Sequence, residues 1–517
     1  MQSNPQTNPQ TPQATPKDFF EQAKQLLAAG DVFEASKRAG KLRAHFPEEP
    51  PILAIHGITL AKLGIYGPAI ADMRTSSELT LQSLQTQDEE GEDNPARPRI
   101  VDQYIRLQTE IGRSLVALGD IQDGKDEIQL ALDMDPDRPD VIGGMAEAVS
   151  ASGDTDGAYA MIDDAMERKL DEMTLMLSYA RVIDQAADFD TQRATACKDS
   201  LAKHVQEIGL PAGLLATLLR AHGTICDRLG EYQEAFNSFR RAAKLRRGGY
   251  NAELNAKMTN KVIENWTPEA IDKLVRPEGE IGAQRVLLCG SIHSGSPEVE
   301  SLLEELPNTI STGPIESLGM ICSGVLNSAT GVLRAMVPSP EGHRGDQLNK
   351  LAMAYAQQCD AAIRMHGMRT VDTHPHNIPL AGCLAMAMRG VTVIQCRRDP
   401  VEHTLAIYCD EMAGNHPYTG DLISTASYIK DSERLMDHWT SVLNDERVGA
   451  RVINIQYEQI LSDPEGVLRQ LAESLGADAG EEVFAGLQAT TPKGPGSHAS
   501  EYGTASKQLR EFFGAAV

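Results

Sequence analysis

The sequence is poor in basic side chains for its length. It has 48 lysines and arginines against 73 aspartates and glutamates, which gives a formal charge of -25. A nucleic-acid-binding protein carries a basic footprint, so this balance excludes that class of protein. It leaves room for a local basic pocket that binds a single anionic ligand.

Long apolar runs and paired cysteines are also missing. No run of about 18 apolar residues occurs, so no membrane span is expected. The eight cysteines form no C-x-x-C pair and lie mostly in apolar stretches, as do Cys289, Cys383 and Cys396. We therefore expect reduced, packed thiols in a cytoplasmic protein. Residues 1–16 are polar and proline-rich without an apolar signal core, which predicts a disordered lead-in.

Glycines recur at a fixed spacing in the first half of the chain. Gly30 and Gly64 are 34 residues apart, and so are Gly119 and Gly153. With the small and aromatic residues around these glycines, the period resembles the tetratricopeptide repeat over roughly 230 residues. The resemblance implies a helical solenoid at residues 17–249. Its groove would bind a protein or peptide partner; alternatively, the array would be a structural or oligomerising scaffold. The sequence does not fix the oligomeric state.

Two segments interrupt the repeat pattern, and a break follows it. Residues 82–99 contain the acidic stretch D-E-E-G-E-D-N-P, for which we expect a solvated loop. Residues 173–204 have a helical pattern without the glycine, which predicts a degenerate repeat. Residues 250–282 resemble a helical connector, and we expect a second domain at residues 283–517.

A strand-like run in the second domain ends in two arginines. Residues 391–396 are apolar and β-branched, and Arg397, Arg398, Asp399 and Pro400 follow them before a helical pattern. Ligands bind where a parallel strand ends and a helix begins, and two guanidinium groups beside helix N–H groups favour an anion such as phosphate. The alternative is a surface pair of arginine and aspartate that caps the helix.

A second run of this kind leads into a glycine-containing loop. Residues 285–289 are followed by Gly290-x4-Gly295, the glycine spacing of a P-loop, and then by a helical pattern. A strand, a glycine loop and a helix together form a cradle for phosphate. Ser296 and Pro297 stand where a P-loop has lysine and serine or threonine, which argues against a nucleoside triphosphatase or nucleotide kinase. The alternative is an ordinary tight turn between strand and helix.

The two segments together resemble the cofactor motifs of sulfotransferases that use PAPS (3′-phosphoadenosine 5′-phosphosulfate). Bacterial proteins in which this domain follows tetratricopeptide repeats are the closest likeness. The first motif, for the 5′ phosphate, is matched by Gly290, Ser294, Gly295 and Ser296. The second motif, for the 3′ phosphate, is matched by Arg397, Arg398, Asp399, Pro400, Glu402, Leu405 and Tyr408. The resemblance covers about 230 residues. It implies an α/β P-loop-like domain with a short, mostly parallel sheet and PAPS as cofactor.

Several residues depart from the family's pattern. His293 replaces the loop arginine, Pro297 a threonine, Thr373 a lysine, and Ala406 the serine that bonds the 3′ phosphate. The resemblance implies a glutamate or histidine base, so Glu316 and His293 are the catalytic candidates. Glu316 also fits a solvated carboxylate at a helix start. Two hypotheses follow: a transferase that sulfates a hydroxyl or amine acceptor brought by the repeats, or an inactive transferase-like domain in an interaction scaffold.

Histidines near these motifs raise the question of a metal site. They are His366, His374, His376 and His403. None has a cysteine or carboxylate partner at a firm ligand spacing, and H-x-H is common by chance. We therefore expect no metal there. The nucleophile motif G-x-S-x-G of hydrolases is absent as well.

Overall fold

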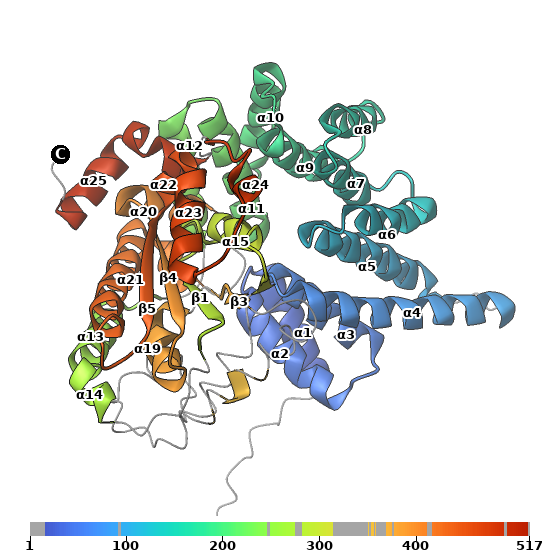
Figure 1. Ribbon diagram of the computed structural model, residues 1–517. Coiled ribbons are helices and arrows are strands. Elements are labelled where there is room, and N and C mark those ends of the chain that lie inside the picture. The colour runs from blue at the N-terminus through green and yellow to red at the C-terminus, as the bar shows by residue number, and fades with distance from the viewer. Residues whose placement is uncertain are drawn as a thin grey trace, which may run out of the picture. The chain divides into compact units, whose positions relative to one another are not determined.

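The chain folds into two compact units. The structure is a computed structural model, and it describes residues 16–90, 95–245, 249–273, 282–313, 350, 353–355, 357, 369–374, 377–410, 416–490 and 494–514. One unit comprises Met1–Gly248 with Cys409–Gly420, and the other comprises Gly249–Tyr408 with Asp421–Val517. Within the described residues the first unit is helical, whereas the second contains a β-sheet (Figure 1).

The first unit is built from successive helix pairs. Its helices are α1 (Pro16–Ala28), α2 (Val32–His45), α3 (Pro50–Lys62), α4 (Tyr66–Glu90), α5 (Arg97–Ala117), α6 (Ile121–Met134), α7 (Pro139–Ala151), α8 (Thr155–Glu167), α9 (Glu172–Gln185), α10 (Thr191–His204), α11 (Ala212–Arg228), α12 (Tyr232–Leu245) and the 3-10 turn η2 (Pro417–Gly420). The turns inside five pairs contain a glycine with positive φ, at Gly30, Gly64, Gly119, Gly153 and Gly230. Only glycine adopts this conformation without strain, so the glycine period marks the turns and the helical repeat is confirmed.

Two segments were expected to interrupt the repeat pattern. The segment without the glycine, residues 173–204, forms a helix pair as predicted, α9 with α10. The prediction of a loop over residues 82–99 is wrong at both ends, because α4 continues to Glu90 and α5 begins at Arg97. Leu84 is buried on the extension of α4, and the surrounding glutamines are good helix formers, so the segment remains helical.

The second unit is organised around a parallel sheet. Its strands are β1 (Arg285–Cys289), β2 (Thr309–Gly313), β3 (Arg369–Asp372), β4 (Thr392–Arg397) and β5 (Arg451–Gln456). They lie in the order β2-β3-β1-β4-β5, and every pair is parallel. From β1 the chain continues to β2, at one edge of the sheet, whereas from β4 it continues to β5, at the other edge. The switch in strand order therefore falls between β1 and β4, where open α/β sheets bind their ligands.

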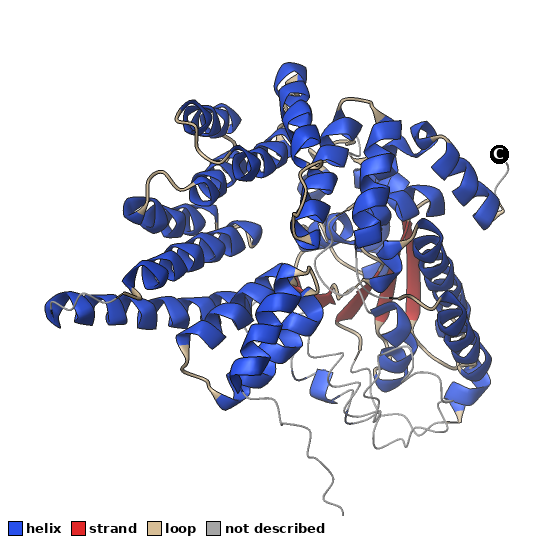
Figure 2. Ribbon diagram, turned by 180° about the vertical axis from the view of Figure 1, so that it is seen from behind, coloured by secondary structure: helices blue, strands red, loops and turns tan. Residues whose placement is uncertain are grey.

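Helices cover both faces of this sheet (Figure 2). The helices are α13 (Ala252–Asn265), α14 (Pro268–Asp272), α15 (Ser296–Glu304), α19 (Asn377–Ala387), α20 (Pro400–Cys409), α21 (Leu422–Leu443), α22 (Tyr457–Ser462), α23 (Pro464–Leu475), α24 (Glu481–Phe484), the 3-10 segment η3 (Pro495–Tyr502) and α25 (Thr504–Phe513). Leu287 and Cys289 pack against α13, α19 and α21, whereas Val286 and Leu288 pack against α15, α22 and α23. Burial on both faces explains the continuous apolar runs and confirms the predicted α/β class.

The segment expected to connect the domains belongs to the core of the second unit. Val262, Trp266 and Ile271 of this segment are fully buried in the same cluster as β1 and β4. The indole ring of Trp266 meets that of Trp439 edge to face, with ring centroids 6.0 Å apart. The cysteines that the structure describes with their side chains are buried and unpaired, as expected. No described helix is long and apolar enough to span a membrane.

Candidate functional site

Two loops meet at the switch point of the sheet. Residues 290–295 connect β1 to α15, and Arg398 with Asp399 connects β4 to α20. Because β1 pairs with β4 in parallel, with Cys289 opposite Gln395, both loops leave the same edge of the sheet. The sequence predicted this arrangement of strand, loop and helix at both places.

The glycine loop is closed so tightly that no side chain fits at Gly290. A Cβ atom there would lie 2.2 Å from Ser294 Oγ and 2.4 Å from Ser296 Oγ. These two hydroxyl oxygens are 3.1 Å apart, within hydrogen-bond distance. Gly295 has a φ of 94°, and a Cβ atom there would lie 2.6 Å from the ring of Tyr457. The backbone therefore curls tightly around two hydroxyl groups.

His293 adopts a left-handed conformation in this loop. Its φ is 66°, which costs a residue with a Cβ atom about 1 kcal/mol or more. The structure thus brings His293 to the loop together with Gly290, Ser294, Gly295 and Ser296. The other catalytic candidate, Glu316, lies outside the described residues.

Side chains from the α20 segment hold the carbonyl groups of the loop. His403 Nε2–H donates to Ile292 O at 2.8 Å, and Arg398 Nη1–H donates to His293 O at 3.2 Å. Burial lowers the pKa of His403 to about 3, so the imidazole is neutral at physiological pH. Both carbonyl oxygens are therefore tied to α20. His403 has a structural partner in this loop, which explains it without a metal.

Arg398 is a buried cation with incomplete pairing. Its side chain is 5% exposed, and the guanidinium stacks over the ring of Tyr457 with its Cζ 4.4 Å from the ring centroid. The carboxylate of Glu402 approaches only to 3.8 Å, and Arg398 Nε has no hydrogen-bond partner among the described residues. Burial raises the pKa of Glu402, although Arg398 acts in the opposite direction. A buried charge without full compensation is costly, so this position favours an additional anion.

A segment near the C-terminus also reaches Arg398. A Cβ atom at Gly496 would lie 2.5 Å from Arg398 Nη2 and 3.0 Å from Ala406 Cβ. The close approach of Gly496 means that four separate parts of the chain surround Arg398: the glycine loop, α20, Tyr457 and this segment.

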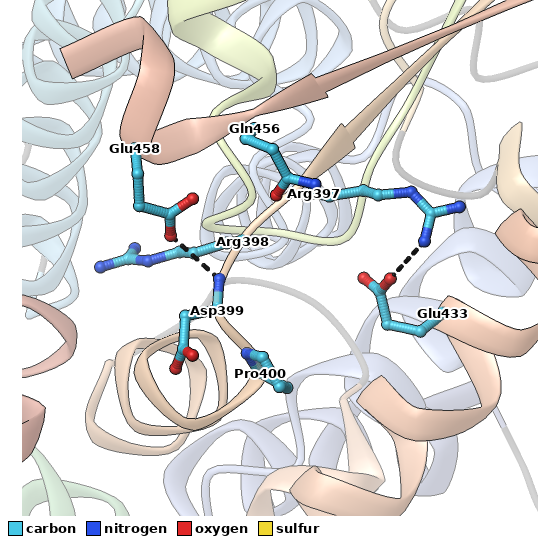
Figure 3. A pocket seen from close by; sticks show the side chains of 7 residues that line it. All are labelled: Arg397, Arg398, Asp399, Pro400, Glu433, Gln456 and Glu458. Carbon is cyan, nitrogen blue, oxygen red and sulfur yellow. Dashed lines mark hydrogen bonds and ion pairs between the residues drawn. The ribbon is translucent and has the colours of Figure 1, made fainter. Parts of the chain in front are cut away.

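The side chains of Arg397 and Arg398 extend in different directions, and that of Arg397 reaches toward Glu433 (Figure 3). Arg397 Nη1 lies 2.7 Å from Glu433 Oε2 and 2.8 Å from Asp437 Oδ1, and Nε–H donates to Asn454 Oδ1 at 2.9 Å. Burial raises the pKa of Glu433, while Arg397 opposes that shift. The charge of Arg397 is thus compensated by two carboxylates on α21.

A cavity of about 380 Å³ opens beside the two arginines. It is lined by Arg397, Arg398, Asp399, Pro400, Glu433, Gln456 and Glu458 (Figure 3). All three of its carboxylates have partners. Glu433 pairs with Arg397, Glu458 accepts a hydrogen bond from the backbone N–H of Asp399 at 2.9 Å, and Asp399 Oδ1 accepts from the first backbone N–H groups of α20. The cavity therefore presents both signs of charge, with Arg398 as the cation that lacks full compensation.

The end of β3 carries polar groups at the same edge of the sheet. Asp372 is buried and accepts a hydrogen bond from Tyr355 Oη at 2.9 Å and another from the backbone N–H of His374 at 3.1 Å. Burial lowers the pKa of His374. Thr373, which replaces the family's lysine, is partly exposed and brings no cation. His366 and His376 lie outside the described residues.

Comparison with known families decides what this unit is. Residues 327–481 match the model of the sulfotransferase family. The C-terminal region is a sulfotransferase-family domain. The match includes the Arg398 segment and begins after the glycine loop. The family resemblance predicted from the sequence is thereby confirmed.

Solved structures and curated sequences give a weaker comparison. The C-terminal part of a tetratricopeptide repeat-containing protein from Cytophaga hutchinsonii is similar at 16% identity, with 47% of this chain and 84% of that chain covered and a TM-score of 0.24. A sulfotransferase from Mycobacterium avium is similar at 14% identity, with 63% of this chain and 97% of that chain covered and a TM-score of 0.29. No curated protein matches the chain in a sequence comparison.

Proposed function

We propose that the sulfotransferase-family domain binds PAPS and transfers its sulfuryl group to a hydroxyl or amine acceptor. The observation that carries this proposal is the position of Arg398. It is a buried guanidinium without full compensation, beside a loop that leaves no room for a Cβ atom at Gly290. A phosphate group satisfies both features, because it brings negative charge and several acceptor oxygens.

The residues at the switch point fit the phosphate groups of this cofactor. Gly290, Ser294, Gly295 and Ser296 would hold the 5′ phosphate through hydroxyl groups and backbone N–H groups. Arg398 would hold the 3′ phosphate. The hydroxyl group of Ser291 is also buried at this loop and has no hydrogen-bond partner among the described residues. When bound, PAPS supplies the sulfuryl group and a phosphate leaving group.

The chain's own residues would position and stabilise the reactants. The buried loop and the stacked Arg398 exclude water around the phosphate charges and fix their orientation, which accounts for much of group-transfer catalysis. His293 on the loop and Glu316 remain the candidates for moving the acceptor's proton. Removal of one preorganised donor costs ~3–4 kcal/mol of transition-state stabilisation, so the replacement of the family's loop arginine by His293 predicts a slow enzyme.

The alternative is a tetratricopeptide interaction scaffold with an inactive transferase domain. Three observations favour it: Arg397 is compensated by carboxylates, Ala406 offers no hydroxyl group beside Arg398, and Gly496 packs against the guanidinium. In either case we propose that the repeats bind a protein or peptide, which would be the acceptor in the first hypothesis.

Calorimetric titration of the full-length chain with PAP, the desulfated cofactor, tests the proposal, with ATP as the control ligand. We expect saturable, micromolar binding of PAP and much weaker binding of ATP. No binding of PAP would leave the scaffold hypothesis. Sulfation assays with labelled PAPS then separate an active transferase from a domain that only binds the nucleotide.

A further inference from the structure

The last repeat brings two helices close together. Helices α11 and α12 are joined by a turn at Gly230, and Gly223 on α11 leaves no space for a side chain. A Cβ atom at Gly223 would lie 2.7 Å from the ring of Phe239 on α12.

Three potential metal ligands meet at this contact. His222 and Cys226 are four residues apart on α11, so they share one helix face. Glu234 projects from α12 toward them. His222 Nε2 lies 3.6 Å from Glu234 Oε1 and 3.8 Å from Cys226 Sγ, and the three ligand atoms lie within 4.8 Å of one another.

We propose that His222, Cys226 and Glu234 bind a divalent transition metal ion, with zinc as the best fit and water as the fourth ligand. Zinc bonds of about 2.0–2.3 Å in a tetrahedron separate a nitrogen from a neighbouring oxygen or sulfur ligand by about 3.4–3.6 Å. The two separations from His222 Nε2, 3.6 and 3.8 Å, are close to these values. A distance of 3.6 Å between nitrogen and carboxylate oxygen is too long for a direct hydrogen bond.

The surroundings of His222 orient the ring for such a role. Its Nδ1 lies 2.9 Å from Ser238 Oγ, which is four residues after Glu234 on α12. With the proton on Nδ1 donated to this hydroxyl group, the lone pair is left on Nε2, beside Glu234. The sulfur of Cys226 lies 3.6 Å from Nδ1 and 3.8 Å from Nε2. A hydrogen bond from the second ring nitrogen is the usual support of a metal-binding histidine.

The ligand types suit zinc better than a hard cation. Binding would replace the thiol proton of Cys226 by the metal and release one proton to solvent. Sulfur and imidazole ligands favour zinc or cobalt over magnesium or calcium.

The remaining charges near the cluster have both signs: Lys198 and Arg241 on one side of the balance, and the carboxylates of Glu231 and Asp227 on the other. Lys198 is paired with the carboxylate of Glu231 at 2.7 and 2.8 Å. The side chain of Glu234 is 55% exposed, whereas His222 is buried, so the ion would enter from solvent at the glutamate. Bound metal would join α11 to α12.

Cobalt titration of the tag-free full-length chain, stripped of metal with a chelator, tests the site. We expect one equivalent of Co²⁺ to bind with the near-ultraviolet absorption of a thiolate–cobalt bond, and zinc to displace it. Cys226→Ser should abolish this absorption. The matched control is Cys197→Ser, because Cys197 is also a buried free cysteine of the same unit.

A second set of variants keeps the test valid if Cys226→Ser does not fold. Glu234→Gln changes an exposed side chain and should weaken cobalt binding at least about tenfold, and Ser238→Ala should weaken it about 10- to 100-fold. Glu231→Gln, on a neighbouring carboxylate that pairs with Lys198, should leave the affinity unchanged. Absence of saturable binding, or an affinity that Glu234→Gln does not alter, would overturn the proposal.

Discussion

Arg397 and Arg398 are neighbours in the chain but serve opposite faces of the sheet. Successive residues of a strand point to opposite faces, so Arg397 follows Gln395 and Val393 toward α21, whereas Arg398 follows Cys396 toward α15. The glycine loop leads into α15. The alternation of side chains along the strand could therefore have predicted that Arg398, and not Arg397, reaches this loop.

The split between the two arginines gives a direct prediction for nucleotide binding. Arg398→Gln should weaken PAP binding about 10- to 100-fold, since a hydrogen bond to a charged group contributes about 1.5–3 kcal/mol. Arg397→Gln should change the affinity by less than about threefold, because Arg397 is engaged by Glu433 and Asp437. Calorimetry on both purified variants measures this difference. Equal losses would show that the phosphate lies in the cavity between the arginines.

His403 predicts a pH dependence of stability. Its pKa falls from 6.5 toward about 3 on folding, so between these values the unfolded chain binds a proton that the folded chain does not. Stability is therefore highest above pH 6.5 and decreases as the pH falls through that window. His403→Gln keeps an N–H donor for Ile292 O but does not titrate. Between pH 6.5 and 5, its free energy of unfolding should therefore fall by about 1.5 kcal/mol less than that of the wild type.

Urea unfolding monitored by tryptophan fluorescence can measure this difference. The chain's two tryptophans, Trp266 and Trp439, are both in the core of the second unit, so the signal reports on that unit. Glu300, Glu402 and Glu433, whose pKa values burial raises, contribute in the opposite sense but are present in both proteins. If the free energies of unfolding of the two proteins changed equally with pH, the assignment of this effect to His403 would be contradicted.

At the scale of elements, the strands, turns and helix starts around the site were predictable. Residues 285–289 form β1 as expected, and α20 begins at Pro400, where a missing N–H group leaves no partner unsatisfied. The approach of η3 to Arg398 was not predictable in the same way. It joins residues almost a hundred positions apart, and no local pattern in the sequence encodes such a contact.

In the contact between α19 and α21, we expect Gly382→Ala to destabilise the protein, although helix propensity alone would predict stabilisation. Gly382→Ala in an isolated helix would stabilise it by up to about 1 kcal/mol. Here a Cβ atom would lie 2.3 Å from Cη2 and Cζ3 of the Trp439 ring, so we expect a net loss of about 1–3 kcal/mol from overpacking. Unfolding of the variant and the wild type in urea measures this difference in the free energy of unfolding.

A double-mutant cycle tests whether the ring is the cause. Trp439→Phe removes the ring atoms that a Cβ atom at Gly382 would meet. Gly382→Ala should therefore cost less in the Trp439→Phe background, with Trp266 as the remaining fluorophore. Additive effects of the two substitutions would place the strain elsewhere.

For the whole molecule, the order of a helical repeat and an α/β domain could be predicted because each leaves a periodic pattern. Glycines 34 residues apart mark the repeats, and buried strands before loops mark the sheet. Which unit holds each connecting segment could not be predicted. Gly249 begins the second unit, whereas Cys409–Gly420 groups with the first, and such assignments depend on contacts between distant residues.

The two binding proposals assign one ligand to each unit, and hydrogen exchange can locate both in the intact chain. Zinc should slow exchange in α11 and α12, because it would join them through His222, Cys226 and Glu234. PAP should slow exchange in the Gly290 loop and at the start of α20. Mass spectrometry of peptides from the full-length protein, with each ligand added alone, measures these effects. Protection by PAP only in the repeats would contradict the nucleotide site, and protection by zinc only around the sheet would contradict the metal site, so either failure is recognised independently of the other.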